Sequence, residues 1–187
     1  MIVDPIGTNR IDLFALVSYI PGALGQFLDR LRDELVVGCR SKAHITILPP
    51  RPTTTAFRTN CRTIEDRLDG FGSFQVGLTS VQIFEKSNVI YAALDQGSAE
   101  LTAMHAALGV EGLQFQEKFP YRPHVTLAQD LDPETVPQVL ELATRRWRES
   151  LPGRTFEVNS LSFVRNSDGT RWIDLAQYDL TTLGVRR

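Results

Sequence analysis

The stretch RPHVTLA, residues 122–128, contains one of the three histidines of the chain, with a threonine two positions later. The stretch AHITIL, residues 43–48, repeats this His-x-Thr pattern 80 positions earlier. Because side chains alternate on a strand, each histidine and its threonine share one face, and the apolar residues share the other. Each motif therefore predicts a short strand with an apolar face against helices and a polar face that borders a groove.

The rest of the sequence repeats one order of elements around the motifs: strand, helix, His-bearing strand, helix, strand. Runs of β-branched and aromatic residues predict strands, and apolar residues at helical spacing predict helices. The expected strands cover residues 11–20, 43–50, 73–85, 88–95, 124–128, 156–164 and 171–180. The expected helices run through residues 24–35, 57–68, 101–108 and 136–147. Ser98 is a candidate N-cap, and Asp168-Gly169 signals the turn of a closing hairpin.

This repeat predicts a single domain over residues 1–187, with two lobes that arise from the repeats 11–85 and 88–180. The spacing from the first strand of each half to its histidine is 33 and 36 positions, so the histidines hold matching places. We expect a duplicated two-lobed α+β fold, in which helices flank two antiparallel sheets and a central cleft carries the two His-x-Thr strands.

The amino-acid composition of the chain limits the kinds of binding partner that we expect. The chain of 187 residues is 42% hydrophobic, which is enough for a core, and its formal charge of −2 gives no general attraction to duplex nucleic acid. A small nucleotide or an RNA end remains open as a partner. No apolar run approaches the roughly 20 residues that cross a bilayer, and the N-terminal stretch lacks the layout of a signal peptide. Because two cysteines, Cys39 and Cys61, cannot form a disulfide framework, we expect a cytoplasmic protein. We also expect a monomer without a membrane partner.

Two His-x-Thr strands side by side would place two imidazoles and two hydroxyls around one point. Phosphodiester cleavage needs a base for the attacking oxygen and an acid for the leaving oxygen, and imidazole titrates near neutral pH. His44 and His124 are therefore the candidate acid–base pair. Thr46 and Thr126 are candidate donors to the non-bridging phosphate oxygens. A lone strand histidine is more often a solvated residue than a catalyst, whereas two of three histidines in matching places favour catalysis.

The stretches AHITIL and RPHVTLA resemble the paired signatures of the two-histidine phosphoesterase superfamily, which includes 2′-5′ RNA ligase-like proteins and 2′,3′-cyclic nucleotide phosphodiesterases. The resemblance implies a bilobal α+β fold and a metal-independent reaction, and it assigns catalysis to the His and Thr positions of both motifs. Many relatives carry a basic residue where this chain has Gln129. Two explanations follow: either the substrate differs from that of these relatives, or Arg40, Lys42 or Arg122 contacts the phosphate instead.

Three aromatic residues near the motifs, Tyr91, Phe119 and Tyr121, are candidates for stacking on a base. Packing inside the protein is the alternative for each, and it is favoured for Tyr91. His105 has no threonine two positions later, and we interpret it as structural or exposed. Zinc-type Cys and His spacings and Gly-rich phosphate loops are absent from the sequence, so this interpretation needs no metal or cofactor.

The sequence thus predicts an enzyme that uses water to open a 2′,3′-cyclic phosphate on a nucleotide or an RNA end. Two alternatives stay open. The substrate can be a 2′-5′-linked or cyclic oligonucleotide, for hydrolysis or ligation. A non-catalytic RNA- or nucleotide-binding module would keep the cleft without turnover, although intact histidines and threonines in both motifs count against it.

Overall fold

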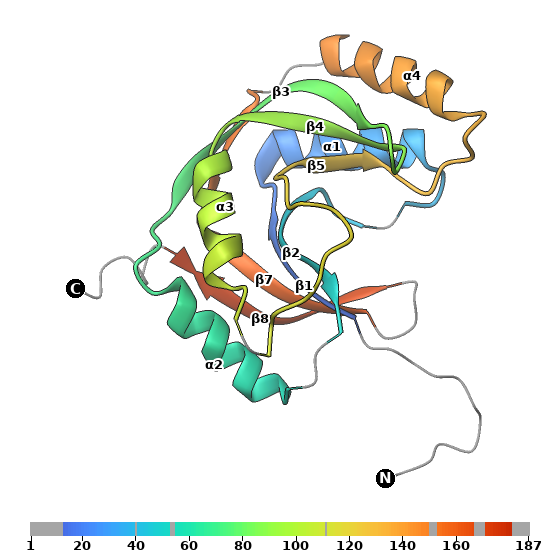
Figure 1. Cartoon of the computed structure of the whole chain (residues 1–187). Coiled ribbons are helices and arrows are strands. Elements are labelled where there is room, and N and C mark those ends of the chain that lie inside the picture. Colours follow the sequence, from blue (N-terminus) through green and yellow to red (C-terminus); the bar gives the residue numbers. More distant parts are fainter. Residues whose placement is uncertain are drawn as a thin grey trace, which may run out of the picture.

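The computed structural model describes residues 13–39, 41–52, 55–110, 112–149, 153–166 and 171–180. In this part of the chain, four helices accompany two four-stranded antiparallel sheets (Figure 1). The strands are β1 Leu13–Tyr19, β2 His44–Arg51, β3 Phe74–Phe84, β4 Val89–Gln96, β5 Val125–Ala128, β6 Thr155–Val158, β7 Ser160–Asn166 and β8 Trp172–Asp179. The helices are α1 Gly22–Leu35, α2 Phe57–Leu68, α3 Ser98–Ala107 and α4 Val136–Glu149. The expected α+β class with two antiparallel sheets is confirmed.

Each sheet takes strands from both halves of the chain. The strand orders are β2-β1-β7-β8 and β5-β4-β3-β6. The lobe boundaries expected at 11–85 and 88–180 therefore do not coincide with the sheets. The reason is local, because a tight turn at residues 85–88 folds β3 directly back on β4. Asn88 takes a φ of 55° in this turn, a left-handed conformation that asparagine tolerates.

The single strand expected over residues 156–164 is in fact two strands, β6 and β7, which are separated at Asn159. β6 pairs with β3, and β7 pairs with β1, so the chain crosses from one sheet to the other at this point. The closing hairpin is confirmed by the antiparallel pairing of β7 with β8. Its Asp168-Gly169 turn signal lies outside the described residues.

Two helix starts show how local sequence sets the element boundaries. Gly97, and not Ser98, is the N-cap of α3, with a φ of 83°. A Cβ atom there would lie 2.7 Å from Cγ2 of Val76, so the backbone conformation and the close contact both require glycine. Pro137 is the second residue of α4, where its missing N–H removes no helical hydrogen bond.

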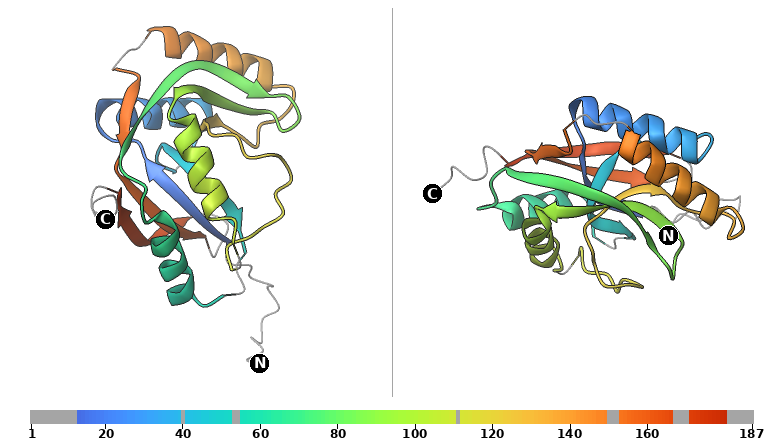
Figure 2. Two further views of the ribbon diagram at one scale, coloured as in Figure 1. Left: turned by 60° about the vertical axis from the view of Figure 1, so that its left-hand side comes forward. Right: turned by 90° about the horizontal axis from the view of Figure 1, so that it is seen from above.

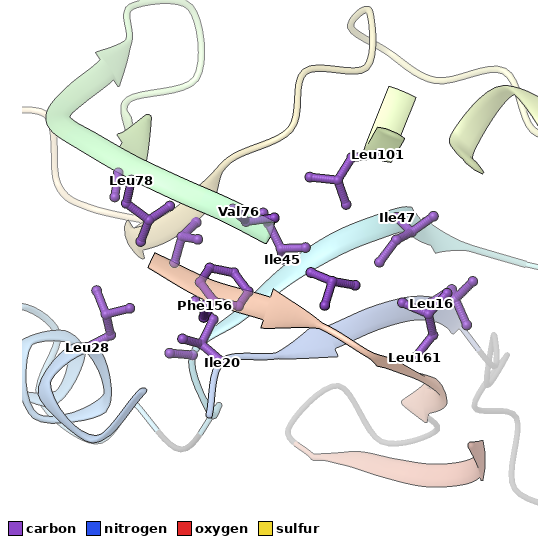
Figure 3. Packing of buried hydrophobic residues seen from close by; sticks show 14 of the residues in the cluster. Leu16, Ile20, Leu28, Ile45, Ile47, Val76, Leu78, Leu101, Phe156 and Leu161 are labelled. Carbon is purple, nitrogen blue, oxygen red and sulfur yellow. The ribbon is translucent and has the colours of Figure 1, made fainter. Parts of the chain in front are cut away.

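One hydrophobic core contains residues from both sheets and all four helices, and Figure 3 shows part of it. Ile45 and Ile47 of β2 lie in this core, and so do Val125 and Leu127 of β5; each is at most 1% exposed. The apolar face of each motif strand is therefore buried as expected. Alternation along the strand turns the histidine and threonine side chains to the opposite face.

Helices from one half of the chain pack on the motif strand of the other half. α1 contacts β5 and α4, whereas α3 contacts β2, β4 and α2. Figures 1 and 2 show the pair α1 and α4 and the pair α2 and α3 at separate places around the sheets. Among the helices that the structure describes, none is both long and apolar enough to cross a membrane.

Candidate active site

The two motif strands lie next to each other. β2 and β5 are the edge strands of their respective sheets, and they are in contact (Figure 1). His44 begins β2, and His124 immediately precedes β5. The two rings are close enough for the charge of His124 to lower the pKa of His44. The fold therefore brings together two histidines that are 80 positions apart in the sequence.

The two motifs share an irregularity as well as a sequence. In both, a half-buried histidine and threonine alternate with buried apolar residues. The pairing with the neighbouring strand then shifts by one residue, which leaves Ile47 unpaired after Thr46 and Leu127 unpaired after Thr126. Such β-bulges are common beside active sites, where they redirect side chains. The internal duplication thus extends to the backbone geometry of the site.

Both histidines are oriented in the same way by the backbone. Nδ1 of His44 lies 2.7 Å from the carbonyl oxygen of Lys42, and Nδ1 of His124 lies 2.7 Å from that of Arg122. A carbonyl oxygen only accepts hydrogen bonds, so this partner assigns the proton to Nδ1 in each ring. In the neutral imidazole, Nε2 then carries the lone pair. Nε2 is therefore the atom that can exchange a proton with a substrate.

Burial keeps His44 neutral. The pKa of His44 is lowered from 6.5 to about 4, chiefly by burial and to a smaller extent by the charges of Arg32 and His124. The hydrogen bond to the Lys42 carbonyl and the carboxylate of Asp29 oppose this shift. The free protein thus carries a neutral base at position 44 at pH 7, and an anion bound nearby would favour its protonated form.

Two stacked aromatic rings pack against His124. The rings of Phe84 and Tyr91 stack with centroids 4.0 Å apart, and His124 meets them edge-on at 5.0 Å and 5.4 Å. The guanidinium of Arg122 lies 5.7 Å from both ring centroids. Burial lowers the pKa of His124, and the charge of Arg122 also lowers it, whereas the hydrogen bond to the Arg122 carbonyl raises it.

The lowered pKa of His44 predicts how stability depends on pH. Between pH 6.5 and about 4, the unfolded chain binds a proton that the folded site excludes, so the free energy of unfolding falls as the pH falls through this range. We expect His44→Gln to remove on the order of 2 kcal/mol of this loss. Urea denaturation at a series of pH values measures the difference between variant and wild type. A constant difference from pH 4 to pH 7 would contradict the burial of a neutral imidazole.

The residues proposed for substrate binding have different locations. Lys42 and Arg122 are exposed beside the two histidines, and Nζ of Lys42 lies 5.6 Å from the centroid of the Tyr19 ring. Tyr91 is 1% exposed and donates its hydroxyl to Oε1 of Gln82 at 3.0 Å, a location that supports packing. Arg40 lies outside the described residues.

The other two aromatic candidates line a hollow of about 510 Å³ beside the first motif. Phe119 is 41% exposed there, and Nζ of Lys118 lies 5.3 Å from its ring centroid. The half-buried Tyr121 donates its hydroxyl to the carbonyl oxygen of Thr46 at 2.8 Å. Further lining residues include Arg51, His105, Phe115 and Glu117.

Sequence reasoning missed two residues of the site, Phe84 and Arg32. Phe84 ends a strand next to a turn, and nothing in its neighbourhood separates it from other strand aromatics. Arg32 continues the apolar stripe of Leu24 and Leu28 at helical spacing and is only 6% exposed. A charged residue inside an apolar stripe was therefore a usable signal.

The arrangement can move protons between two oxygen atoms. Two imidazoles present Nε2 within electrostatic reach of each other, each beside a threonine, and cationic side chains lie around them. A bound anion would favour a proton on one imidazole and leave the other as a base. Within the described residues, no group of three or more His, Cys, Asp or Glu side chains could hold a metal ion.

The chain is similar to known proteins in its sequence pattern and in its fold. Residues 20–170 match the family model of the 2′-5′ RNA ligase superfamily, and no curated protein sequence matches the chain. Escherichia coli LigT in apo form is similar, with a TM-score of 0.62 and 14% identity, covering 92% of this chain and 99% of that one. LigT complexed with 3′-AMP gives 0.60 and 15%, covering 92% and 98%. Kluyveromyces marxianus Usb1 with uridine monophosphate gives 0.54 and 13%, covering 90% and 99%. These likenesses confirm the two-lobed α+β fold.

Proposed function

This chain belongs to the 2′-5′ RNA ligase superfamily, and on this premise we propose that it opens the 2′,3′-cyclic phosphate of a nucleotide or an RNA end without a metal. The observation that carries the proposal is the matched pair of imidazoles. His44 and His124 have their Nδ1 atoms tied to backbone carbonyls in the same way, and both present Nε2 beside a threonine. One pair of such groups provides the base and the acid that the reaction requires.

The proposed reaction is hydrolysis in one displacement step. Nε2 of the neutral histidine takes a proton from water while the water oxygen forms a bond to phosphorus. The bond from phosphorus to one ribose oxygen breaks, and the protonated histidine gives its proton to that leaving oxygen. The product is a phosphomonoester with a free neighbouring hydroxyl. Because the site is pseudo-symmetric, the orientation of the scissile bond decides which histidine acts as the base.

The motif threonines and the nearby cationic side chains would bind the phosphate group, while the two histidines transfer protons. Thr46 and Thr126 would donate hydrogen bonds to the non-bridging oxygens, whose negative charge grows in the transition state. Lys42 and Arg122 lie near the histidines and would attract the phosphate in place of a basic residue at Gln129.

The hollow beside the first motif is the proposed place for the base or for the next nucleotide of an RNA end. Its exposed Phe119 offers a ring face, and its cationic Lys118 lies close by. The structures of LigT with 3′-AMP and of Usb1 with uridine monophosphate support a small nucleotide as the ligand of this fold. We place the protein in the cytoplasm, as a monomer that does not bind extended duplex nucleic acid.

We expect the purified chain to convert a 2′,3′-cyclic nucleotide or a cyclic-phosphate RNA end into a monoester in the presence of EDTA. The two imidazoles supply the proton transfers, so a chelator should leave the rate unchanged. Phosphorus NMR follows the loss of the cyclic-phosphate signal, and a preparation of the double variant His44→Ala with His124→Ala controls for contaminants. Loss of turnover in EDTA with recovery on adding a divalent ion would contradict the mechanism. Turnover of a 2′-5′ dinucleotide alone would favour the oligonucleotide alternative, and binding without turnover would favour the binding module.

A further inference from the structure

The carbonyl oxygens of the two motif threonines accept hydrogen bonds from side chains. β2 and β5 are edge strands, and a β-bulge follows Thr46 in one and Thr126 in the other. A bulge disrupts the ladder locally, and buried backbone carbonyls then need donors from elsewhere. The position of each threonine therefore depends on side chains that supply these donors.

Each of these carbonyls is held by one side chain from the other half of the chain. Oη of Tyr121 donates to the carbonyl oxygen of Thr46 at 2.8 Å, across 75 positions of sequence. Nη1 of Arg32 donates to the carbonyl oxygen of Thr126, across 94 positions. The two bonds run in opposite directions between the halves, in keeping with the packing of α1 on β5.

Tyr121 is itself fixed by its neighbours. Its ring stacks on His105 at 3.9 Å and an interplanar angle of 4°, and Nδ1 of His105 lies 2.8 Å from the carbonyl oxygen of Ile47 in the bulge. Glu117 lies 3.6 Å from Nε2 of His105 and accepts a hydrogen bond from Arg51 at 2.6 Å. Burial and the Glu117 carboxylate raise the pKa of Tyr121 above its usual range, so its hydroxyl stays a donor.

Arg32 is a buried cation without a carboxylate partner among the described residues. It is 6% exposed. Its Nη2 lies 3.6 Å from Sγ of Cys39, and its Nε has no hydrogen-bond partner. A buried charge without an opposite charge destabilises a fold, and such exceptions concentrate at functional sites.

We propose that Tyr121 and Arg32 are positioning residues that together brace the two motif strands against each other. Each bond holds the threonine of one motif from the opposite half of the chain. The brace sets the separation and the relative orientation of His44 and His124. This inference rests on the proposed function for its kinetic effects, whereas its effect on the two imidazoles needs no substrate.

The first test removes one oxygen atom. Tyr121→Phe keeps the ring on His105 and deletes the donor to Thr46, and it should lower kcat about 10-fold while KM changes less than about 3-fold. The matched control is Tyr178→Phe, which removes the tyrosine hydroxyl that donates to the carbonyl oxygen of Cys61 at 3.5 Å between β8 and α2. The control should keep its kcat. An unchanged kcat in Tyr121→Phe, or an equal fall in the control, would overturn the proposal.

The second test separates the geometry of Arg32 from its charge. Arg32→Lys keeps the charge but loses the planar fork, and it should lower kcat about 10-fold. Arg32→Met also removes the charge, so the pKa of His44 should rise in that variant and stay near its wild-type value in Arg32→Lys. The other charged groups near His44, namely Asp29 of α1 and His124, are unchanged in both variants. If Arg32→Met does not fold, Arg32→Lys still decides, and wild-type kcat in Arg32→Lys would overturn the brace.

A measurement without substrate distinguishes the two proposals. NMR of the imidazole signals should show a displaced His44 resonance in Tyr121→Phe and a displaced His124 resonance in Arg32→Lys, with neither displaced in Tyr178→Phe. If the wild type turns over no phosphoester while these displacements occur, the proposed function fails and the brace stands. If turnover is present and neither resonance moves, the brace fails and the function stands.

Discussion

Replacing either His44 or His124 with alanine is expected to lower kcat on a cyclic phosphate about 10²- to 10⁴-fold. Each imidazole would carry one of the two proton transfers, and each has its Nδ1 tied to the carbonyl oxygen of the residue two positions before it. Replacing both should cost much less than the product of the single effects, because residues that act as one unit are not additive. Single-turnover kinetics on a confirmed substrate measures each loss.

The matched variants for this experiment are His44→Gln and His124→Gln. A glutamine amide can donate toward the Lys42 or Arg122 carbonyl but cannot transfer a proton, so these variants should be as inactive as the alanine variants. Circular dichroism and thermal melting should show a folded chain in every case, since both side chains lie opposite the core-facing residues of their motifs. Near wild-type turnover in any folded variant would show that the replaced histidine is not catalytic.

Replacing Thr46 or Thr126 with valine is expected to lower kcat by about 10- to 10³-fold. Valine keeps the β-branched shape of threonine but lacks the hydroxyl, so the strand should persist while one donor to the phosphate is lost. The loss should be seen mainly in kcat, because the charge on the non-bridging oxygens grows in the transition state. Steady-state kinetics that separates kcat from KM tests this expectation.

Two controls make the threonine experiment decisive. Thr46→Ser and Thr126→Ser retain the hydroxyl and should keep most of the activity. Thr79→Val removes a strand hydroxyl outside the motifs, where Oγ1 donates to the carbonyl oxygen of Ala93 at 3.3 Å, and it should leave kcat unchanged. Equal losses in the valine and serine variants would show that shape, and not hydrogen bonding, is the requirement.

The order and type of the elements followed from local sequence. The apolar stripe of α1 and the alternation in β2 and β5 are short-range patterns, and each gave the expected helix or strand with boundaries only a few residues away. Side-chain periodicity shows which face of a helix or strand is buried, and burial of that apolar face is the main interaction that stabilises the element in the fold. The largest error lay at Asn159, where the chain changes sheet, because a change of sheet has no composition signal.

The sequence by itself determined the α+β class and the shared face of each histidine and its threonine, since both follow from periods of two and about 3.6 residues along the chain. Tertiary structure alone decided which strands share a sheet, because pairing between distant edges depends on register and on the hairpin that joins β3 to β4. It also decided that Arg32 holds Thr126 and that Phe84 packs against His124. These contacts join segments that are far apart in the sequence. Their partners are selected by the geometry of the packed core, and neither residue carries a local sign of its partner.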